Sequence, residues 1–234
     1  MKEHPETGSK IFLKRPKIFY GWYIVGAGAI NSFVNMSIFL VGPAVFLTDI
    51  QSELGWSLAA ISLGFSIRQF ESGLLAPLGG YLIDRVGPRP MAVAGTLTMT
   101  LGLLLFSQIQ SLPTFYLAAV VIAFGQGMGA MNAFQTAAVQ WFRRRRGTAS
   151  SFLVMGRGLG YVGVIPITFL LVWFGWRDAA AISALAFLAI GLPSCLVLRR
   201  NPERYGLLPD GDPMVRDHRG LTDRQLAYQP EQSF

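Results

Sequence analysis

Charged residues, cysteine and histidine are scarce in this chain of 234 residues. Charged residues make up 14% of the sequence, and there are two histidines and a single cysteine, Cys195. One cysteine excludes an intrachain disulfide. The sequence also lacks a zinc-type cluster of cysteine and histidine, a phosphate-binding P-loop and the nucleophile elbow of a hydrolase. We therefore expect no metal site, no cofactor, no enzyme activity and no ATP-driven reaction.

Long apolar runs dominate the sequence instead. Hydrophobic residues make up 52% of the chain, and they gather in blocks long enough to cross the roughly 30 Å hydrocarbon layer of a membrane as helices. Short polar connections separate the blocks, so successive helices lie antiparallel. We predict an all-α, polytopic membrane protein with six transmembrane helices, at about 18–47, 58–83, 91–109, 114–142, 148–174 and 179–198.

Basic residues lie almost entirely on alternate connections between these blocks. Of the 20 lysines and arginines, five precede the first block, two lie between the second and third, four between the fourth and fifth, and six follow the sixth. Arg177 falls on the opposite side. Because cytoplasmic loops are rich in lysine and arginine, we predict that both termini are cytoplasmic and that the protein lies in the cell (inner) membrane. The net charge of +7 reflects this topology, and we expect no nucleic-acid partner.

The chain divides into three parts. Residues 1–17 are polar and basic and form a cytoplasmic N-terminal segment, and the apolar block that follows is too long for a signal peptide, so it is retained as a helix. Residues 18–198 form the six-helix bundle. Residues 199–234 are polar and rich in turn-forming residues, and we expect them to form a cytoplasmic tail.

A short polar stretch from Gly80 to Pro90 separates the second and third blocks. Gly87 accepts a positive φ and Pro88 suits the first turn of a helix, so one helix ends and the next begins there. The stretch resembles the loop between helices 2 and 3 of major facilitator superfamily transporters, G-x-L-x-D-R-x-G-x-R. The matching residues, which form a conformational-switch loop in this interpretation, are Gly80, Leu82, Asp84, Arg85, Gly87 and Arg89.

Further stretches are similar to the branch of this superfamily that holds monocarboxylate transporters and oxalate:formate antiporters. They are Tyr20-Gly21-Trp22, Gly55-Trp56-Ser57, Trp141-Phe142-Arg143 with Arg146-Gly147-Thr148-Ala149, and Pro202-Glu203-Arg204-Tyr205-Gly206-Leu207. The resemblance implies a secondary transporter of small organic anions, mono- or dicarboxylates, that works with protons or by exchange of a counter-solute.

Drug:proton antiporters are the alternative within the superfamily. The arginine that they carry early in the fourth helix corresponds to Ala123 here. In the fifth helix Tyr161 follows Gly160, where their pattern has a proline.

Three charged residues lie inside the apolar blocks, namely Arg157, Arg68 and Glu71. An unpaired charge in the middle of a bilayer is unfavourable by at least about 2.5 kcal/mol, so such residues normally face a cavity or a partner. We predict that Arg157 and Arg68 bind the anionic substrate, because guanidinium stays charged and can hold two carboxylate oxygens. Glu71 is the candidate for proton coupling, although Arg68 and Glu71 are three residues apart and can instead neutralise each other.

Uncharged polar side chains in the blocks complete the predicted substrate site. They are Asn35, Gln135 and Tyr161. Each of them also suits a hydrogen bond between helices.

Glycine and proline mark the helix crossings and bends. Gly156, Gly158, Gly160 and Gly163, and likewise Gly125, Gly127 and Gly129, place small residues where two helices can approach closely. Prolines lie in or near the ends of the blocks, where kinks form. These prolines are Pro43, Pro77, Pro166 and Pro193.

The superfamily's transporters have twelve helices, so the resemblance implies that this chain is a half-length piece. The expected partner is a second six-helix half in the same polypeptide, or a second copy in a homodimer if the six-helix chain is complete. A rival of another class is a receptor or assembly protein that keeps the scaffold without transporting, since fold alone does not fix function.

Overall fold

A computed structural model describes residues 19–128, 130–199, 202 and 209–211, with the side chains of 68–76, 130, 131 and 211 excepted. The predicted segment 1–17 and most of the predicted tail 199–234 lie outside these residues. The described residues contain no strand, which agrees with the all-α prediction.

Helices follow one another with short connections. The α-helices are α1 Tyr20–Asn35, α2 Gly42–Leu54, α3 Leu58–Val86, α4 Pro88–Ser107, α5 Leu112–Met128, α6 Ala130–Trp141, α7 Arg146–Leu159 and α8 Val164–Leu196. Between α1 and α2 lies the π-helix η1, Met36–Val41. Between α7 and α8 lies the 3₁₀-helix η2, Gly160–Gly163, and a second 3₁₀ turn, η4, covers Pro209–Gly211.

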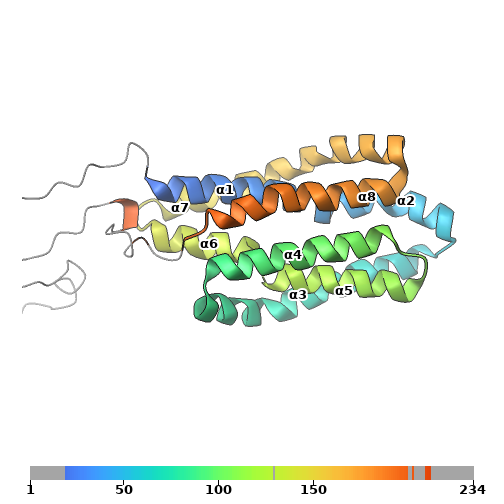
Figure 1. Ribbon diagram of the computed structural model, residues 1–234, viewed down its shortest axis with the longest axis horizontal. Helices are drawn as coiled ribbons and strands as arrows, with labels where there is room; N and C mark the ends of the chain where they lie inside the picture. Colours follow the sequence, from blue (N-terminus) through green and yellow to red (C-terminus); the bar gives the residue numbers. More distant parts are fainter. Residues whose placement is uncertain (1–18, 129, 200–201, 203–208, 212–234) are drawn as a thin grey trace, which may run out of the picture.

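Four helical stretches in the described residues are long and apolar enough to cross a membrane. They are Tyr20–Leu54, Pro88–Ser107, Leu112–Trp141 and Arg146–Leu196, and α3 contributes the shorter apolar stretch Leu58–Ile67. The last stretch, of 51 residues, doubles back at Gly175, whose φ of 77° breaks α8 into two antiparallel arms (Figure 1).

Glycine sets the sharp turns between helices. Gly87 has a φ of 109° and lies between the end of α3 at Val86 and the start of α4 at Pro88, as the sequence predicts. The predicted polar stretch is mostly helical, however, because α3 continues to Val86. Between α2 and α3, Gly55 ends α2 in the left-handed conformation. The Ser57 hydroxyl then caps α3 by accepting a hydrogen bond from the Ala60 N–H at 3.2 Å.

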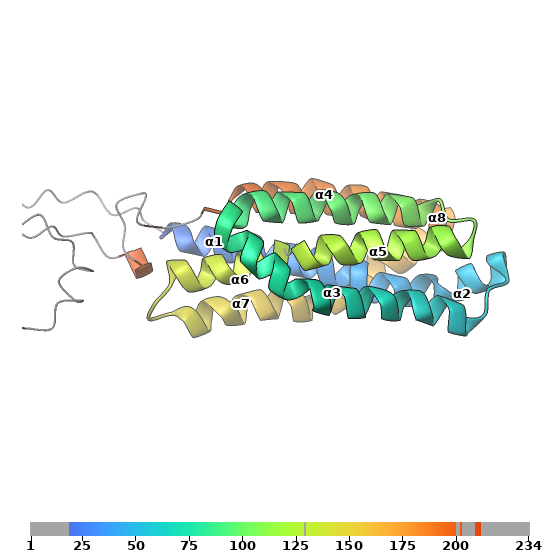
Figure 2. The ribbon, with the colours of Figure 1, turned by 90° about the horizontal axis from the view of Figure 1, so that it is seen from below.

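The bundle is elongated, and its helices run along the long axis in both views (Figures 1 and 2). The start of α1, the α3–α4 turn, the α6–α7 connection and the end of α8 lie together at one end, called here the basic end (Figure 1). The α2–α3 and α4–α5 connections and the Gly175 turn lie at the opposite end. The connections predicted to be basic therefore share one end of the molecule.

Two clusters of buried side chains fill the bundle, one after the other along its length. Toward the basic end, Trp141 and Phe134 of α6 pack with residues of α1, α4 and α7. Toward the opposite end, Phe39, Phe106 and Phe115 pack with residues of α2, α3 and α8. Within these clusters α4 packs against α5 and α8, α3 against α5, and α1 against α7.

Candidate functional site

Arg157 and Tyr161 lie on the same exposed face. Arg157 is near the end of α7, and Tyr161 follows four residues later in η2, so the two side chains are neighbours along the helix. Arg157 is exposed and Tyr161 is 59% exposed. The Arg157 guanidinium makes no hydrogen bond or ion pair with any other described side chain.

Asn35 and Gln135 point into the bundle instead. The Asn35 amide, at the end of α1, lies 3.8 Å from the sulfur of Met99 in α4, at the limit of a weak hydrogen bond. The Gln135 side-chain oxygen, on α6, is buried without a hydrogen-bond partner among the described residues. Within the described part of the chain, no hydrogen bond links either amide to Arg157 or Tyr161.

The side chains of Arg68 and Glu71 lie outside the described residues. Their backbone belongs to α3, which runs without interruption from Leu58 to Val86. Their predicted roles in substrate binding and proton coupling therefore stay predictions.

The predicted switch loop lies at the basic end. Gly80, Asp84 and Arg85 belong to the last turns of α3, and Arg89 belongs to the first turn of α4. The Arg85 guanidinium lies 5.2 Å from the centre of the Tyr81 ring, and Asp84 and Arg89 are exposed. This places the charged part of the motif on the surface of the basic end.

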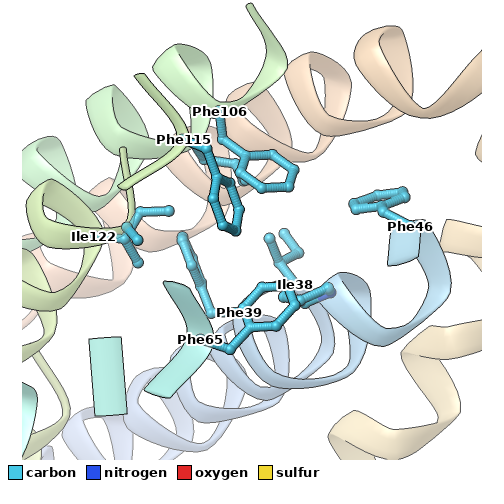
Figure 3. Close-up of a pocket in the computed structure, with 10 residues that line it drawn as sticks. Ile38, Phe39, Phe46, Phe65, Phe106, Phe115 and Ile122 are labelled. Carbon is cyan, nitrogen blue, oxygen red and sulfur yellow. The ribbon is translucent and has the colours of Figure 1, made fainter. Parts of the chain in front are cut away.

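A small apolar cavity of about 20 Å³ lies between η1, α2, α3, α4 and α5 (Figure 3). Phe39, Phe46, Phe65, Phe106 and Phe115 line it together with Ile38, Pro43, Leu103, Ala119 and Ile122. No charged or hydrogen-bonding side chain is among them, so the cavity provides no group that would hold a carboxylate. None of the predicted site residues lines it.

A polar cluster at the opposite end was missed by the sequence reasoning. The Trp176 indole N–H donates to Glu53 Oε2 at 2.6 Å, and Arg177 Nη2 donates to Glu53 Oε1 at 2.9 Å. The Arg177 guanidinium also donates to the Ile109 carbonyl at 2.7 Å and lies 4.4 Å from the Trp176 ring centre. This group, called the Glu53 clamp, ties α2 and α8 to the end of α4. The sequence feature that could have indicated this cluster is Arg177, a basic residue on the side of the membrane where few basic residues are predicted.

A second missed contact lies at the basic end. Asp210 of η4 accepts hydrogen bonds from the backbone N–H groups of Arg143 at 3.0 Å and Arg144 at 2.7 Å. The Trp141 indole donates to the Arg199 carbonyl at 3.0 Å. Together these bonds attach the chain that follows α8 to the α6–α7 connection. Sequence alone does not reveal them because the partners are more than fifty residues apart.

The Major Facilitator Superfamily model matches residues 27–228 of the chain. Among curated proteins, the chain is 30% identical over 165 residues to the oxalate:formate antiporter of Oxalobacter formigenes, an alignment that covers 70% of this chain and 38% of that protein. It is 28% identical over 190 residues to monocarboxylate transporter 13 of Bos taurus, which covers 77% of this chain and 42% of that one.

A multidrug resistance protein, MdtH of Aeromonas hydrophila, is also 28% identical, over 183 residues that cover 74% of this chain and 45% of that protein. The chain thus spans less than half the length of these relatives. Among solved structures, it superposes on the peptide transporter POT (E310Q mutant) in complex with alafosfalin, with a TM-score of 0.63 and 17% identity, over 93% of this chain and 44% of that one.

The family model agrees with the superfamily predicted from the sequence, and the curated relatives include an oxalate:formate antiporter and a monocarboxylate transporter. Members of this family are multi-pass membrane transporters rather than enzymes. The chain belongs to the Major Facilitator Superfamily.

Proposed function

We propose that this chain is the six-helix N-terminal half of a secondary transporter of small organic anions. In this proposal both of its ends are cytoplasmic, it lies in the cell (inner) membrane, and it rocks against a second six-helix half around a central site. The substrates are mono- or dicarboxylates, moved with protons or in exchange for a counter-solute. Support for the substrate class comes from the similarity to the oxalate:formate antiporter and to monocarboxylate transporter 13.

The position of Arg157 is the observation that carries the proposal. Arg157 lies eleven residues after the start of α7 at Arg146, which is about 16 Å along a helix at 1.5 Å per residue. That depth is near the middle of a hydrocarbon layer about 30 Å thick. An exposed guanidinium without a partner at that depth is unfavourable unless a cavity, a second half or an anion faces it.

The chemistry of a guanidinium suits a carboxylate. It stays charged at physiological pH and offers parallel N–H donors to the two oxygens. Tyr161, on the same face, offers a hydroxyl that can donate a hydrogen bond to the carboxylate of the substrate, or to a hydroxyl group where the substrate has one. Glu71 is proposed to carry the proton in symport, because it is a carboxyl group within an apolar block and such groups form proton relays in transporters.

Transport assays with the complete encoded protein in proteoliposomes test the proposal. We expect uptake of labelled oxalate, formate or lactate against preloaded counter-solute or with an inward proton gradient. Arg157→Gln should reduce uptake by at least about a hundredfold, as expected for loss of a charge-assisted bidentate pair. Arg145→Gln, an exposed arginine in the α6–α7 connection, is the matched control. Full carboxylate uptake by Arg157→Gln would contradict the proposed role of Arg157.

Drug efflux is the second candidate function, and the similarity to MdtH supports it. The same vesicles distinguish the two. Proton-driven movement of a lipophilic cation such as ethidium, with no uptake of any carboxylate, would favour drug efflux. Binding of carboxylate without uptake of any solute would favour a receptor on the same scaffold.

A further inference from the structure

Two helices leave α-helical geometry at the same level of the bundle. In η1 the Gly42 N–H bonds to the Ser37 carbonyl, five residues back, which is the wide π-type turn. At the end of η2 the Val164 N–H bonds to the Tyr161 carbonyl, three residues back, which is the narrow 3₁₀ type. One helix is locally underwound and the other overwound.

A proline lies shortly after each irregular segment. Pro43 follows η1 by two residues, and Pro166 follows η2 by three. Proline has no N–H, so the Phe39 and Val162 carbonyls lose the α-type donor four residues later. The backbone around each proline therefore takes other hydrogen bonds, and a helix bends most easily where this ladder is interrupted.

The two segments pack directly against each other. The Ser37 hydroxyl lies 2.8 Å from both the Phe33 and the Gly160 carbonyl oxygens and shares its proton between them. Neither glycine of η2 has room for a side chain. A Cβ on Gly160 would lie 2.8 Å from the Phe33 carbonyl oxygen, and one on Gly163 would overlap the Ser37 side chain.

We call α1–η1–α2 one rod, and α7, η2 and the first arm of α8 the other. The two rods also contact each other on both sides of η1 and η2. Toward the basic end, α1 and α7 meet at Gly28, against Leu153, and at Gly156, against the Ala29 backbone. Toward the opposite end, a Cβ on Gly42 of α2 would lie 3.8 Å from Ile167 in the first arm of α8, and the Glu53 clamp joins the end of α2 to Trp176, where the second arm of α8 begins after Gly175. The two rods therefore contact each other on both sides of η1 and η2.

Free space lies beside η1. Ile38 and Phe39 line one wall of the apolar cavity (Figure 3), together with Pro43. Ser37, on the same π-turn, contacts the Gly160 carbonyl of η2 instead. Phe39 packs edge-on against Phe187 of α8 with ring centroids 4.8 Å apart. Protein interiors are otherwise close-packed and resist bending. The small cavity is a gap in this packing, directly beside the π-turn, and it leaves room for small side-chain shifts there.

We propose that η1 and η2 act as one joint, at which the rod α1–η1–α2 bends together with the rod formed by α7, η2 and the first arm of α8, and that the small cavity beside η1 admits the side-chain shifts that begin this motion. Arg157 lies one turn before η2, on the basic-end side of the joint. Bending at the joint therefore changes the position of Arg157 relative to the arms beyond η2. The effect expected below on the kcat of transport rests on the proposed transport function, whereas the bending itself does not.

Filling the cavity tests the joint. Ala119→Met adds a long apolar side chain to the cavity wall, and Ala44→Met makes the same change at an exposed position of α2. We expect hydrogen–deuterium exchange of the η1 amides in the complete protein to slow at least about tenfold in Ala119→Met, since local opening is blocked. It should be unchanged in Ala44→Met. If carboxylates are transported, kcat should fall with KM nearly constant.

Removing the shared hydrogen bond gives a second, independent test. In Ser37→Ala the η2 segment loses its hydrogen bond with η1, so the exchange of amides 160–164 should become faster. In Ser37→Thr the exchange should stay slow, because threonine keeps the hydroxyl group. Unchanged exchange in both Ser37→Ala and a folded Ala119→Met would overturn the joint. Should Ala119→Met not fold, unchanged exchange in Ser37→Ala alone would overturn it. Absence of carboxylate uptake in the wild type would contradict the proposed function and leave the exchange results to decide on the joint.

Discussion

The α4–α5 and α1–α7 crossings are both lined with glycine, and they differ in one respect. At the α4–α5 crossing, a Cβ on Gly125 would lie 2.8 Å from the Met99 backbone nitrogen, and one on Gly102 would lie 2.9 Å from the Ile122 nitrogen. Both of these helices remain α-helical there. At the α1–α7 crossing, both rods leave α-helical geometry at η1 and η2.

The α4–α5 crossing has close-packed glycines but regular helices, so glycine spacing and departure from α-helical geometry are separate properties. Small residues allow two backbones to approach, and both crossings use them in this way. Neither α4 nor α5 has a proline beyond its first turns, whereas Pro43 and Pro166 follow η1 and η2. The interrupted hydrogen-bond ladder, rather than the close approach, distinguishes the crossing that we propose to bend.

The largest expected effect comes from breaking the α1–α7 crossing. In Gly156→Leu the new side chain would overlap the Ala29 backbone, which cannot move aside as a side chain can. We expect a loss of more than about 3 kcal/mol of stability and no monodisperse protein on size exclusion. Gly158→Leu is the control, since no atom lies within 4 Å of a Cβ there. A Gly156→Leu protein as stable as Gly158→Leu would mean that the two helices do not meet as described.

An intermediate effect is expected at the regular crossing. Gly125→Ala places a methyl group against the backbone of Met99 and Gly95, and such overpacking costs about 1–3 kcal/mol. The melting temperature should fall relative to Gly26→Ala, a change on α1 with open space around it. Because α4 and α5 have no joint, we expect hydrogen exchange at η1 and η2 to be unaffected. Faster exchange there would show that the two crossings are coupled.

A smaller effect is expected at the Glu53 clamp, which fastens the far ends of the jointed rods. Glu53→Gln removes the charge that Trp176 and Arg177 share, and because the carboxylate is 48% exposed we expect a loss of only about 1 kcal/mol. Thermal unfolding should shift downward in Glu53→Gln but not in Asp49→Asn, one turn earlier on α2. A shift of equal size in both variants would point to a general effect of charge on α2.

Sequence reasoning identified the helices more successfully than the site. The turn at Gly87 and Pro88 was predicted from the two residues themselves, since a positive φ and a first-turn proline are local properties. The close packing predicted for glycines is confirmed at Gly125, Gly156 and Gly160, whereas Gly158 faces open space. Spacing gives the face of a helix, and only the neighbouring helix decides whether that face is covered.

For the predicted site residues, too, sequence spacing gives the helix face but does not show whether that face is covered by another helix. Arg157 and Tyr161 share a face, as their spacing of four implies, but Asn35 and Gln135 point into the bundle. The Glu53 clamp and the Asp210 contact were not predicted, because their partners come from distant parts of the chain and no sequence pattern links them.

By itself the sequence determined the helical class, the apolar stretches, the separation of basic from neutral connections and the family, since each depends on composition or on residues close together in the chain. The tertiary structure alone decided that Ser37 contacts Gly160, that Glu53 meets Trp176 and that a cavity borders η1. These contacts depend on how helices far apart in the sequence are rotated and aligned against one another. That alignment is a property of the whole bundle, set by the packing of all its helices together.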